Sequence, residues 1–273
     1  PNVFVRTRDS GSMVEAFAVA SGKGGTGKTT TTLALGMALA RRYDVTVVDA
    51  DTGMANLLFH AGLADAPVTL QDLLAPDARG PDGAAIDVHD ACYDRHGMRV
   101  VPCGTSLAGF ERSDPARLRE VVAELAADTD VLLLDSPATL ASKSAVLPIV
   151  LADRVVVVTQ PTIPALSDAL KVQEYAASYG TGIAGVLFNK VRGDLGSVGA
   201  QAERYFEGPT LGSVPDSDAA RAARDAGEPL LSHAPDSAAA EAYRAAAAGI
   251  EPEPKAVGDV ADRFRSAVVP ERP

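Results

Sequence analysis

The sequence predicts an α/β protein with three layers, in which helices cover both faces of a mostly parallel, twisted sheet. Short β-branched apolar segments recur along the 273 residues, and a helical or polar stretch separates each from the next. Hydrophobic residues make up 47% of the chain, but aromatics make up only 5% and Trp is absent. A core of Ala, Val and Leu suits parallel strands beneath Ala-rich helices. Repeated strand–helix–strand units build such a sheet.

The predicted strands and helices follow one another in a regular order. The apolar run 14–20 ends in a glycine-rich loop, and residues 29–42 have helical apolar spacing with two closing arginines, which favour a helix C-terminus. Asp114 and Pro115 are typical of the first residues of a helix, here predicted within 113–125. Further buried strands are predicted at 44–51, 98–102, 130–136, 154–160 and 182–189.

These elements define one large domain, predicted to span residues 13–248. Residues 1–12 do not join the pattern, and the "GS" before Met13 is interpreted as a cloning remnant or as part of a natural N-terminal extension. Prolines after Gly249 mark the end of the domain, so residues 249–273 are predicted to form a tail. Its Val, Phe and Val at four-residue spacing allow a weak amphipathic helix, although a solvated tail is favoured over a membrane anchor.

Charge and cysteine content narrow the class of protein. The formal net charge is −11, which disfavours binding to a nucleic-acid backbone or to anionic lipid. The Asp-rich, Lys-poor bias resembles that of salt-loving microbes. Cys92 and Cys103 fit neither a zinc spacing nor a disulfide framework, so a reducing interior is expected. Because no apolar run is long enough to span a bilayer and no secretory signal pattern is present, we expect a cytoplasmic location.

A phosphate-binding loop is predicted at Gly22–Thr29, which reads G-K-G-G-T-G-K-T and fits G-x-x-x-x-G-K-[ST]. It follows a predicted strand and opens a predicted helix, the context that the motif requires. The glycines let several backbone N–H groups converge on phosphate oxygens. Lys28 is expected to reach the β- and γ-phosphates, and the Thr29 hydroxyl to bind Mg²⁺. The residues expected to contact the nucleotide are Gly24, Gly25, Thr26, Gly27, Lys28, Thr29 and Thr30.

Three carboxylates are predicted at the same edge of the sheet, because ligands of open parallel sheets lie at the carboxyl ends of the strands. Asp135 follows the buried run "VLLL" and is expected to hold a magnesium-bound water. The strand "VTVVDAD" supplies Asp49 and Asp51. Asp51 is the candidate that orients the attacking water, and Asp49 is expected to support the magnesium shell or the loop.

Together these residues resemble the MinD/ParA family of P-loop ATPases, which has a deviant Walker A motif. The resemblance implies a SIMIBI-like P-loop NTPase fold that uses ATP and Mg²⁺, and its details are most similar to archaeal MinD-like proteins. One departure is Thr139, which stands where a glycine usually follows "DSPA" and could slow hydrolysis. The resemblance is carried by "SGKGGTGKTT", "DADTGMANL", "TLQDLL", "DSPA", "TQPTIPALSDALKV", "LFNKV" and "LGSVPDSDAARAA".

The resemblance also gives roles to residues outside the phosphate loop's own contacts. It implies that Lys23 crosses to the nucleotide of a second subunit, so that two monomers enclose two ATP molecules, much as an arginine finger acts in trans. Asn189 would hydrogen-bond adenine. The remaining implied positions are Pro215 and Asp216, which would line the base, and Asn56 and Asp168, which are candidates for switch and dimer contacts.

Several functions are compatible with these residues. The favoured one is an ATP-driven homodimer with slow hydrolysis that recruits a protein partner or activator and positions a division site, a motility apparatus or a chemosensory array. It would act in the cytoplasm or at the inner face of the membrane. The alternatives are a ParA-like DNA-partitioning ATPase and a protein like the flagellar-number regulators. An iron–sulfur carrier would need paired cysteines, and a small-molecule kinase would need an acceptor-binding motif that is not evident.

Overall fold

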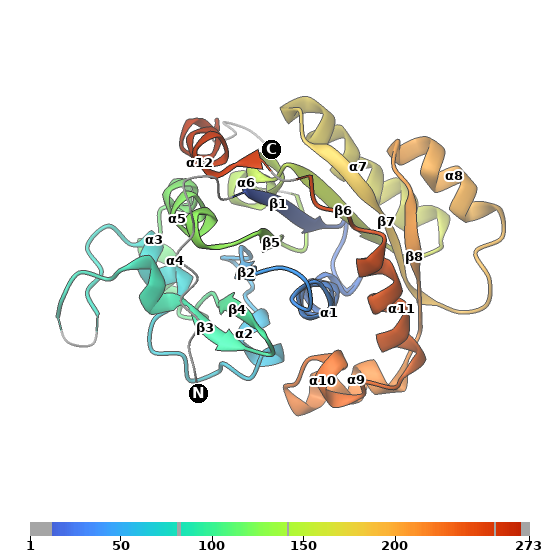
Figure 1. Cartoon of the computed structure of the whole chain (residues 1–273), viewed down its shortest axis with the longest axis horizontal. Coiled ribbons are helices and arrows are strands. Elements are labelled where there is room, and N and C mark those ends of the chain that lie inside the picture. The colour runs from blue at the N-terminus through green and yellow to red at the C-terminus, as the bar shows by residue number, and fades with distance from the viewer. Residues whose placement is uncertain (1–12, 81–82, 141, 254, 269–273) are drawn as a thin grey trace.

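The computed structural model describes residues 13–80, 83–140, 142–253 and 255–268, so the predicted extension 1–12 lies outside the described residues (Figure 1). The fold class predicted from the sequence is confirmed. A mostly parallel sheet has the strand order β3-β4-β2-β5-β1-β6-β7-β8, and β9 pairs with β1. The strands are β1 Met13–Ala20, β2 Val45–Asp49, β3 Tyr93–Arg95, β4 Met98–Val101, β5 Val131–Asp135, β6 Arg154–Thr159, β7 Gly182–Val191, β8 Thr210–Pro215 and β9 Lys255–Ala256.

Helices cover both faces of this sheet, with α1 and α11 on one face and α5, α6 and α7 on the other (Figure 1). This placement follows from right-handed crossovers. The chain passes over β5 on its way from β1 to β2, and it moves in the opposite direction along the sheet from β5 to β6 and then to β7. The helices are α1 Lys28–Leu39, α2 Leu57–His60, α3 Leu70–Leu74, α4 Leu107–Arg112, α5 Leu118–Leu125, α6 Lys143–Leu151, α7 Ile163–Tyr179, α8 Ser197–Phe206, α9 Asp218–Ala226, α10 Leu230–His233, α11 Ala238–Ala248 and α12 Val257–Ser266.

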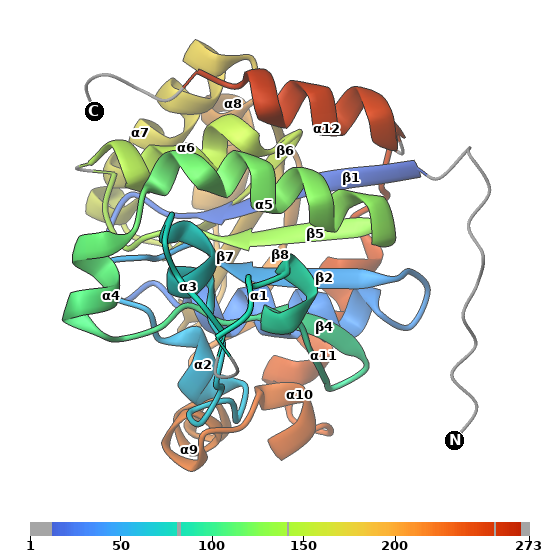
Figure 2. The same ribbon diagram turned by 90° about the vertical axis from the view of Figure 1, so that its left-hand side faces the viewer.

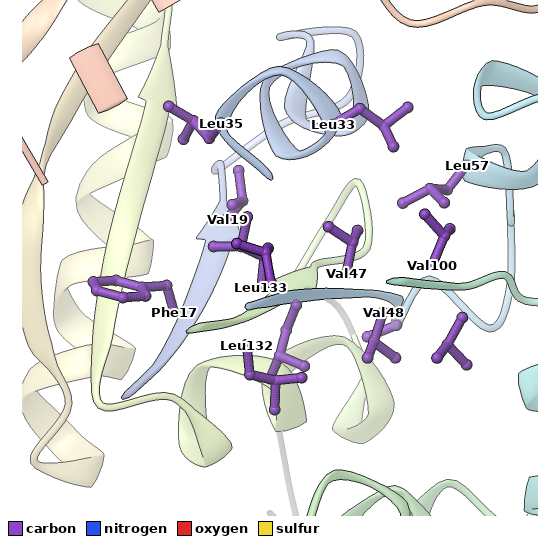
Figure 3. Close-up of a cluster of buried hydrophobic side chains, with 14 of the residues drawn as sticks. Phe17, Val19, Leu33, Leu35, Val47, Val48, Leu57, Val100, Leu132 and Leu133 are labelled. Carbon is purple, nitrogen blue, oxygen red and sulfur yellow. The ribbon is translucent and has the colours of Figure 1, made fainter. Parts of the chain in front are cut away.

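The core follows from alternation along the central strands. Val19 and Leu133 point toward α1, whereas Leu132 and Val48 point to the opposite side of the sheet (Figure 3). Leu33 of α1 packs on the first of these sides. All five side chains are buried, which is why these strands read as continuous apolar runs. Both faces of the sheet are therefore covered by packed apolar side chains. The polar groups that end the strands are left to build a site at the carboxyl edge.

The sequence favoured a C-terminal tail that extends into solvent. The structure differs, because the described part of the C-terminal segment packs on the domain. Helix α12 lies alongside α5 (Figure 2), and Val260 and Phe264 are buried. Asp153, itself buried, accepts a hydrogen bond from the Ala16 amide at 2.9 Å and pairs with Lys255 and Arg263 of this segment. The apolar face of α12 is thus used inside the protein. Within the described part of the chain, no helix is long and apolar enough to cross a membrane.

Candidate functional site

A glycine-rich loop, residues 21–27, joins β1 to α1 at the carboxyl edge of the sheet. Gly25 and Gly27 have positive φ angles of 74° and 95°, a region that residues with a Cβ rarely adopt. Gly22 is required for a different reason, since a Cβ there would lie 1.8 Å from the backbone oxygen of Asp168. The loop therefore presents its amides at the N-terminus of α1, where backbone N–H groups and the helix dipole attract anions.

Asp135 lies directly beneath this loop, as the sequence predicted for a residue that ends a central strand. The Thr29 hydroxyl donates to its Oδ2 at 2.6 Å, and the Thr32 hydroxyl donates to its Oδ1 at 2.8 Å. Asp49 lies next to it, because Asp49 of β2 and Asp135 of β5 are partners in the strand register. Sequence reasoning missed Thr32. Its position three residues after Thr29 places both hydroxyls on the same face of α1, and that spacing was the available signal.

Burial makes these carboxylates unusual. It raises the pKa of Asp135 to about 6, against the effect of the hydrogen bonds from Thr29 and Thr32. The pKa of Asp49 is also raised well above its ordinary value, first by burial and then by the negative charges of Asp135 and Asp51. Burial lowers the pKa of the nearby Lys28. Clustered carboxylates whose ionised form is disfavoured are a good environment for a cation.

The residues fit Mg²⁺, which takes oxygen ligands from hydroxyl, carboxylate and water. The Thr29 hydroxyl would be a direct ligand, and Asp135 would hold a metal-bound water. Two further hydroxyls, that of Thr26 in the glycine-rich loop and that of Ser136 on the cavity wall, are buried and have no hydrogen-bond partner among the described residues. Since buried polar groups are normally paired, these orphaned hydroxyls also indicate a site built for a polar ligand.

Asp49 and Asp51 organise the loop that follows β2. Asp49 accepts hydrogen bonds from the amides of Asp51 and Leu57, both at 3.2 Å, and so holds the two ends of the loop. Asp51 accepts from the Met54 amide at 2.9 Å and lines the cavity described below. Asn56 donates to the Met54 carbonyl and also lines that cavity. Asp49 is thus enclosed by the loop that it holds, whereas Asp51 lies at the cavity.

The two lysines of the loop differ in their surroundings. Lys28 is buried and donates to the Ser21 hydroxyl at 3.1 Å, and that hydroxyl donates in turn to the Lys23 carbonyl at 2.7 Å. For the Lys23 amino group, the described part of the chain offers no hydrogen bond or ion pair. Lys28 therefore belongs to the loop's own site, whereas Lys23 is available to another partner.

A cavity of about 560 Å³ opens beside the loop and is large enough for a nucleotide. Lys23, Gly24 and Thr26 belong to the loop but do not line this cavity. Asp168 is on α7, where it pairs with Lys171 at 3.6 Å, and it does not line the cavity. The predicted residues that do line it are Gly25, Gly27, Lys28, Thr29, Thr30, Asp51, Asn56, Asn189, Pro215 and Asp216.

Several basic residues that line the cavity were not predicted from the sequence. Asp216 accepts hydrogen bonds from Arg192 at 2.7 Å and Arg221 at 2.8 Å, and these bonds hold its pKa below the usual range. Arg224 and His60 also line the cavity. No spacing pattern marks these residues in the sequence, because they come from three separate elements. Only the fold brings them together.

The fold and this site define a P-loop nucleotide-binding protein. Residues 17–230 match the family model described as the CobQ/CobB/MinD/ParA nucleotide-binding domain. The chain belongs to this family, which confirms the resemblance predicted from the sequence.

The names of two related proteins are consistent with this assignment. An uncharacterised ATP-binding protein of Methanocaldococcus jannaschii is 41% identical, and the match covers 77% of this chain and 78% of the relative. The septum site-determining protein MinD of Thermotoga maritima is 35% identical over 62% of this chain and 60% of its own length.

Solved structures of MinD are similar over almost their whole length. MinD of Pyrococcus horikoshii, solved in complex with Mg-ADP, has a TM-score of 0.76 and 32% identity, covering 86% of this chain and 95% of that one. The cell division ATPase MinD of Pyrococcus furiosus has a TM-score of 0.77 and 34% identity, covering 87% and 98%. The chain is thus a MinD-like member of the family.

Proposed function

We propose that this protein is an ATP-dependent dimerisation switch that hydrolyses ATP slowly with Mg²⁺. ATP binding would close a homodimer that recruits a protein partner, and hydrolysis would release it. The observation that carries the proposal is the contrast between the two loop lysines. The Lys28 amino group is buried and donates to Ser21 of its own loop. The Lys23 amino group has no hydrogen-bond or ion-pair partner in the described part of the chain.

Each step of hydrolysis has a residue to perform it. Lys28 and the loop amides would bind the β- and γ-phosphates, and Mg²⁺ bound by Thr29 would neutralise developing negative charge. Asp51 is the carboxylate that lines the cavity, and it would orient the attacking water. Lys23 of the second subunit would add a positive charge to the phosphates, which makes hydrolysis depend on dimerisation.

The cellular role that we favour is positioning of a division site, as the names of the MinD relatives suggest, or of a motility or chemosensory apparatus. DNA partitioning and regulation of flagellar number are the alternatives. The net charge of −11 supports the favoured role over DNA partitioning, since an acidic surface repels phosphate backbones. The burial of Val260 and Phe264 supports a role that does not depend on anchoring by α12.

The dimer switch is tested by light scattering coupled to gel filtration, with ATP and Mg²⁺. We expect Asp51→Ala to accumulate as an ATP-bound dimer, because dimerisation no longer leads to hydrolysis. Lys23→Ala is expected to stay monomeric and to lose hydrolysis. Arg95→Ala, a change of an exposed cation on β3, serves as the control. A Lys23→Ala protein that dimerises and hydrolyses ATP at the normal rate would refute the role in trans.

The cellular role is tested by ATP-dependent co-sedimentation with liposomes and, separately, with DNA, at low and high salt. We expect neither surface to retain the protein. Retention on DNA that weakens steeply with salt would favour partitioning instead. Retention on liposomes would show that the membrane is part of the switch, and a variant of the exposed Val268, Val268→Asp, would then show whether the C-terminal segment provides the contact.

A further inference from the structure

The end of β7 holds the phosphate loop through two adjacent side chains. The Asn189 Nδ2 donates to the Thr26 carbonyl at 2.8 Å, and the Lys190 Nζ donates to the Gly25 carbonyl at 2.8 Å. Two neighbouring side chains therefore bind two neighbouring carbonyls of the loop. Asn189 is buried, and a Cβ on Gly27 would lie 2.2 Å from its Nδ2. The contact is close enough to exclude any larger residue at position 27.

The backbone of β7 is distorted where these side chains leave it. Lys190 has a φ of 56°, an uncommon value for a residue with a Cβ. The pairing of β7 with β8 shifts register between Phe188 and Val191, so Asn189 and Lys190 occupy an irregularity of the strand. The Asn189 Oδ1 accepts a hydrogen bond from the Lys190 amide at 2.9 Å and stabilises this shape. Strand irregularities beside a site often serve to redirect a side chain, and strained backbone tends to occur at functional sites.

Holding these carbonyls fixes the direction of the loop's amides. In a trans peptide the C=O and the following N–H point in opposite directions within one plane. The Gly25 carbonyl shares its peptide with the Thr26 amide, and the Thr26 carbonyl shares its peptide with the Gly27 amide. When both carbonyls are held against β7, both amides point away from β7, and backbone N–H groups at the start of a helix are the groups that bind phosphate oxygens.

We propose that Asn189 and Lys190 are positioning residues that set the phosphate loop in its binding shape before nucleotide arrives. This role is additional to the adenine contact predicted for Asn189, whose amide group keeps one N–H and one acceptor lone pair after its two contacts. The role needs only phosphate binding by the loop. It can therefore be tested without dimerisation or hydrolysis.

The test compares Lys190→Met with Lys171→Met, a matched change of an exposed lysine on α7. Amide hydrogen exchange at Thr26 and Gly27 is measured in the nucleotide-free protein. Binding of Mg-ADP and of inorganic tripolyphosphate, which has no base or ribose, is measured by competition with a fluorescent ADP analogue. We expect faster exchange and about a tenfold weaker affinity for both ligands, the size of one hydrogen bond from a charged donor. Lys171→Met should change neither.

The two ligands separate positioning of the loop from recognition of the nucleoside, and amide exchange in the nucleotide-free protein separates positioning from a direct phosphate contact by Lys190, which lines the cavity. If Lys190→Met weakens ADP alone and leaves tripolyphosphate binding and amide exchange unchanged, Lys190 contacts the nucleoside and the proposal is wrong. Lys190→Arg retains a cationic donor and should recover most of the affinity for both ligands. Asn189→Asp keeps the acceptor for the Lys190 amide but cannot donate to the Thr26 carbonyl. It should speed exchange at Gly27, and unchanged exchange there would also overturn the proposal.

Discussion

The buried carboxylates beneath the phosphate loop should cost the nucleotide-free protein stability, and Asp135→Asn is the change that tests this. Folding raises the pKa of Asp135 from an ordinary 3.8 to about 6. Its contribution to stability is therefore fully present below pH 3.8 and is lost as the pH rises through 6. A shift of about two pKa units corresponds to about 3 kcal/mol at neutral pH.

Asparagine does not titrate and so avoids this cost. It also weakens the hydrogen bonds from Thr29 and Thr32, at about 1 kcal/mol. We therefore expect Asp135→Asn to raise the free energy of unfolding by about 2 kcal/mol at pH 7.5 and to give no gain at pH 4. The measurement is urea denaturation with EDTA and without nucleotide, and Asp65→Asn on an exposed loop is the matched control. A variant less stable than the parent at pH 7.5, or one whose difference is the same at both pH values, would show the reasoning to be wrong.

Three further substitutions test packing around the site and the C-terminal segment. Phe264→Ala should lower the free energy of unfolding by about 3–5 kcal/mol, because this side chain is fully buried, whereas the exposed Val268→Ala should change little in the same urea titration. Gly22→Ala should yield little soluble protein or lose ADP binding by calorimetry, because its Cβ would overlap a backbone oxygen of α7; normal binding would contradict this. Tyr243→Phe leaves the buried Thr31 hydroxyl without its 3.1 Å partner and should cost about 1–2 kcal/mol in thermal unfolding; an unchanged unfolding temperature would contradict this.

The sequence predicted the fold and the phosphate loop because both depend on local patterns. The strands are buried on both faces, so Val131–Asp135 reads directly as apolar residues followed by a carboxylate at the sheet edge. The spacing from Gly22 to Thr29 is fixed by a single strand–loop–helix turn. In these places neighbours in sequence are also neighbours in the site.

Other contacts could not be predicted from the sequence because they join distant segments. Asp153 meets Lys255 and Arg263 from about a hundred residues away, so nothing near it indicates that the C-terminal helix packs on the domain. Asn189 could be placed at the end of its strand, but its contact with the Thr26 carbonyl depends on the irregularity in β7. Such contacts follow from the assembled sheet, and a single linear pattern does not contain them.

The pairing of β9 with β1 has a practical consequence. Met13 is the antiparallel partner of Ala256, so the first described strand and the C-terminal segment meet at the edge of the sheet opposite the nucleotide cavity. A fluorescent protein joined directly before Met13 would therefore attach at the end of the sheet away from the cavity and from the face on which a second subunit is proposed to bind.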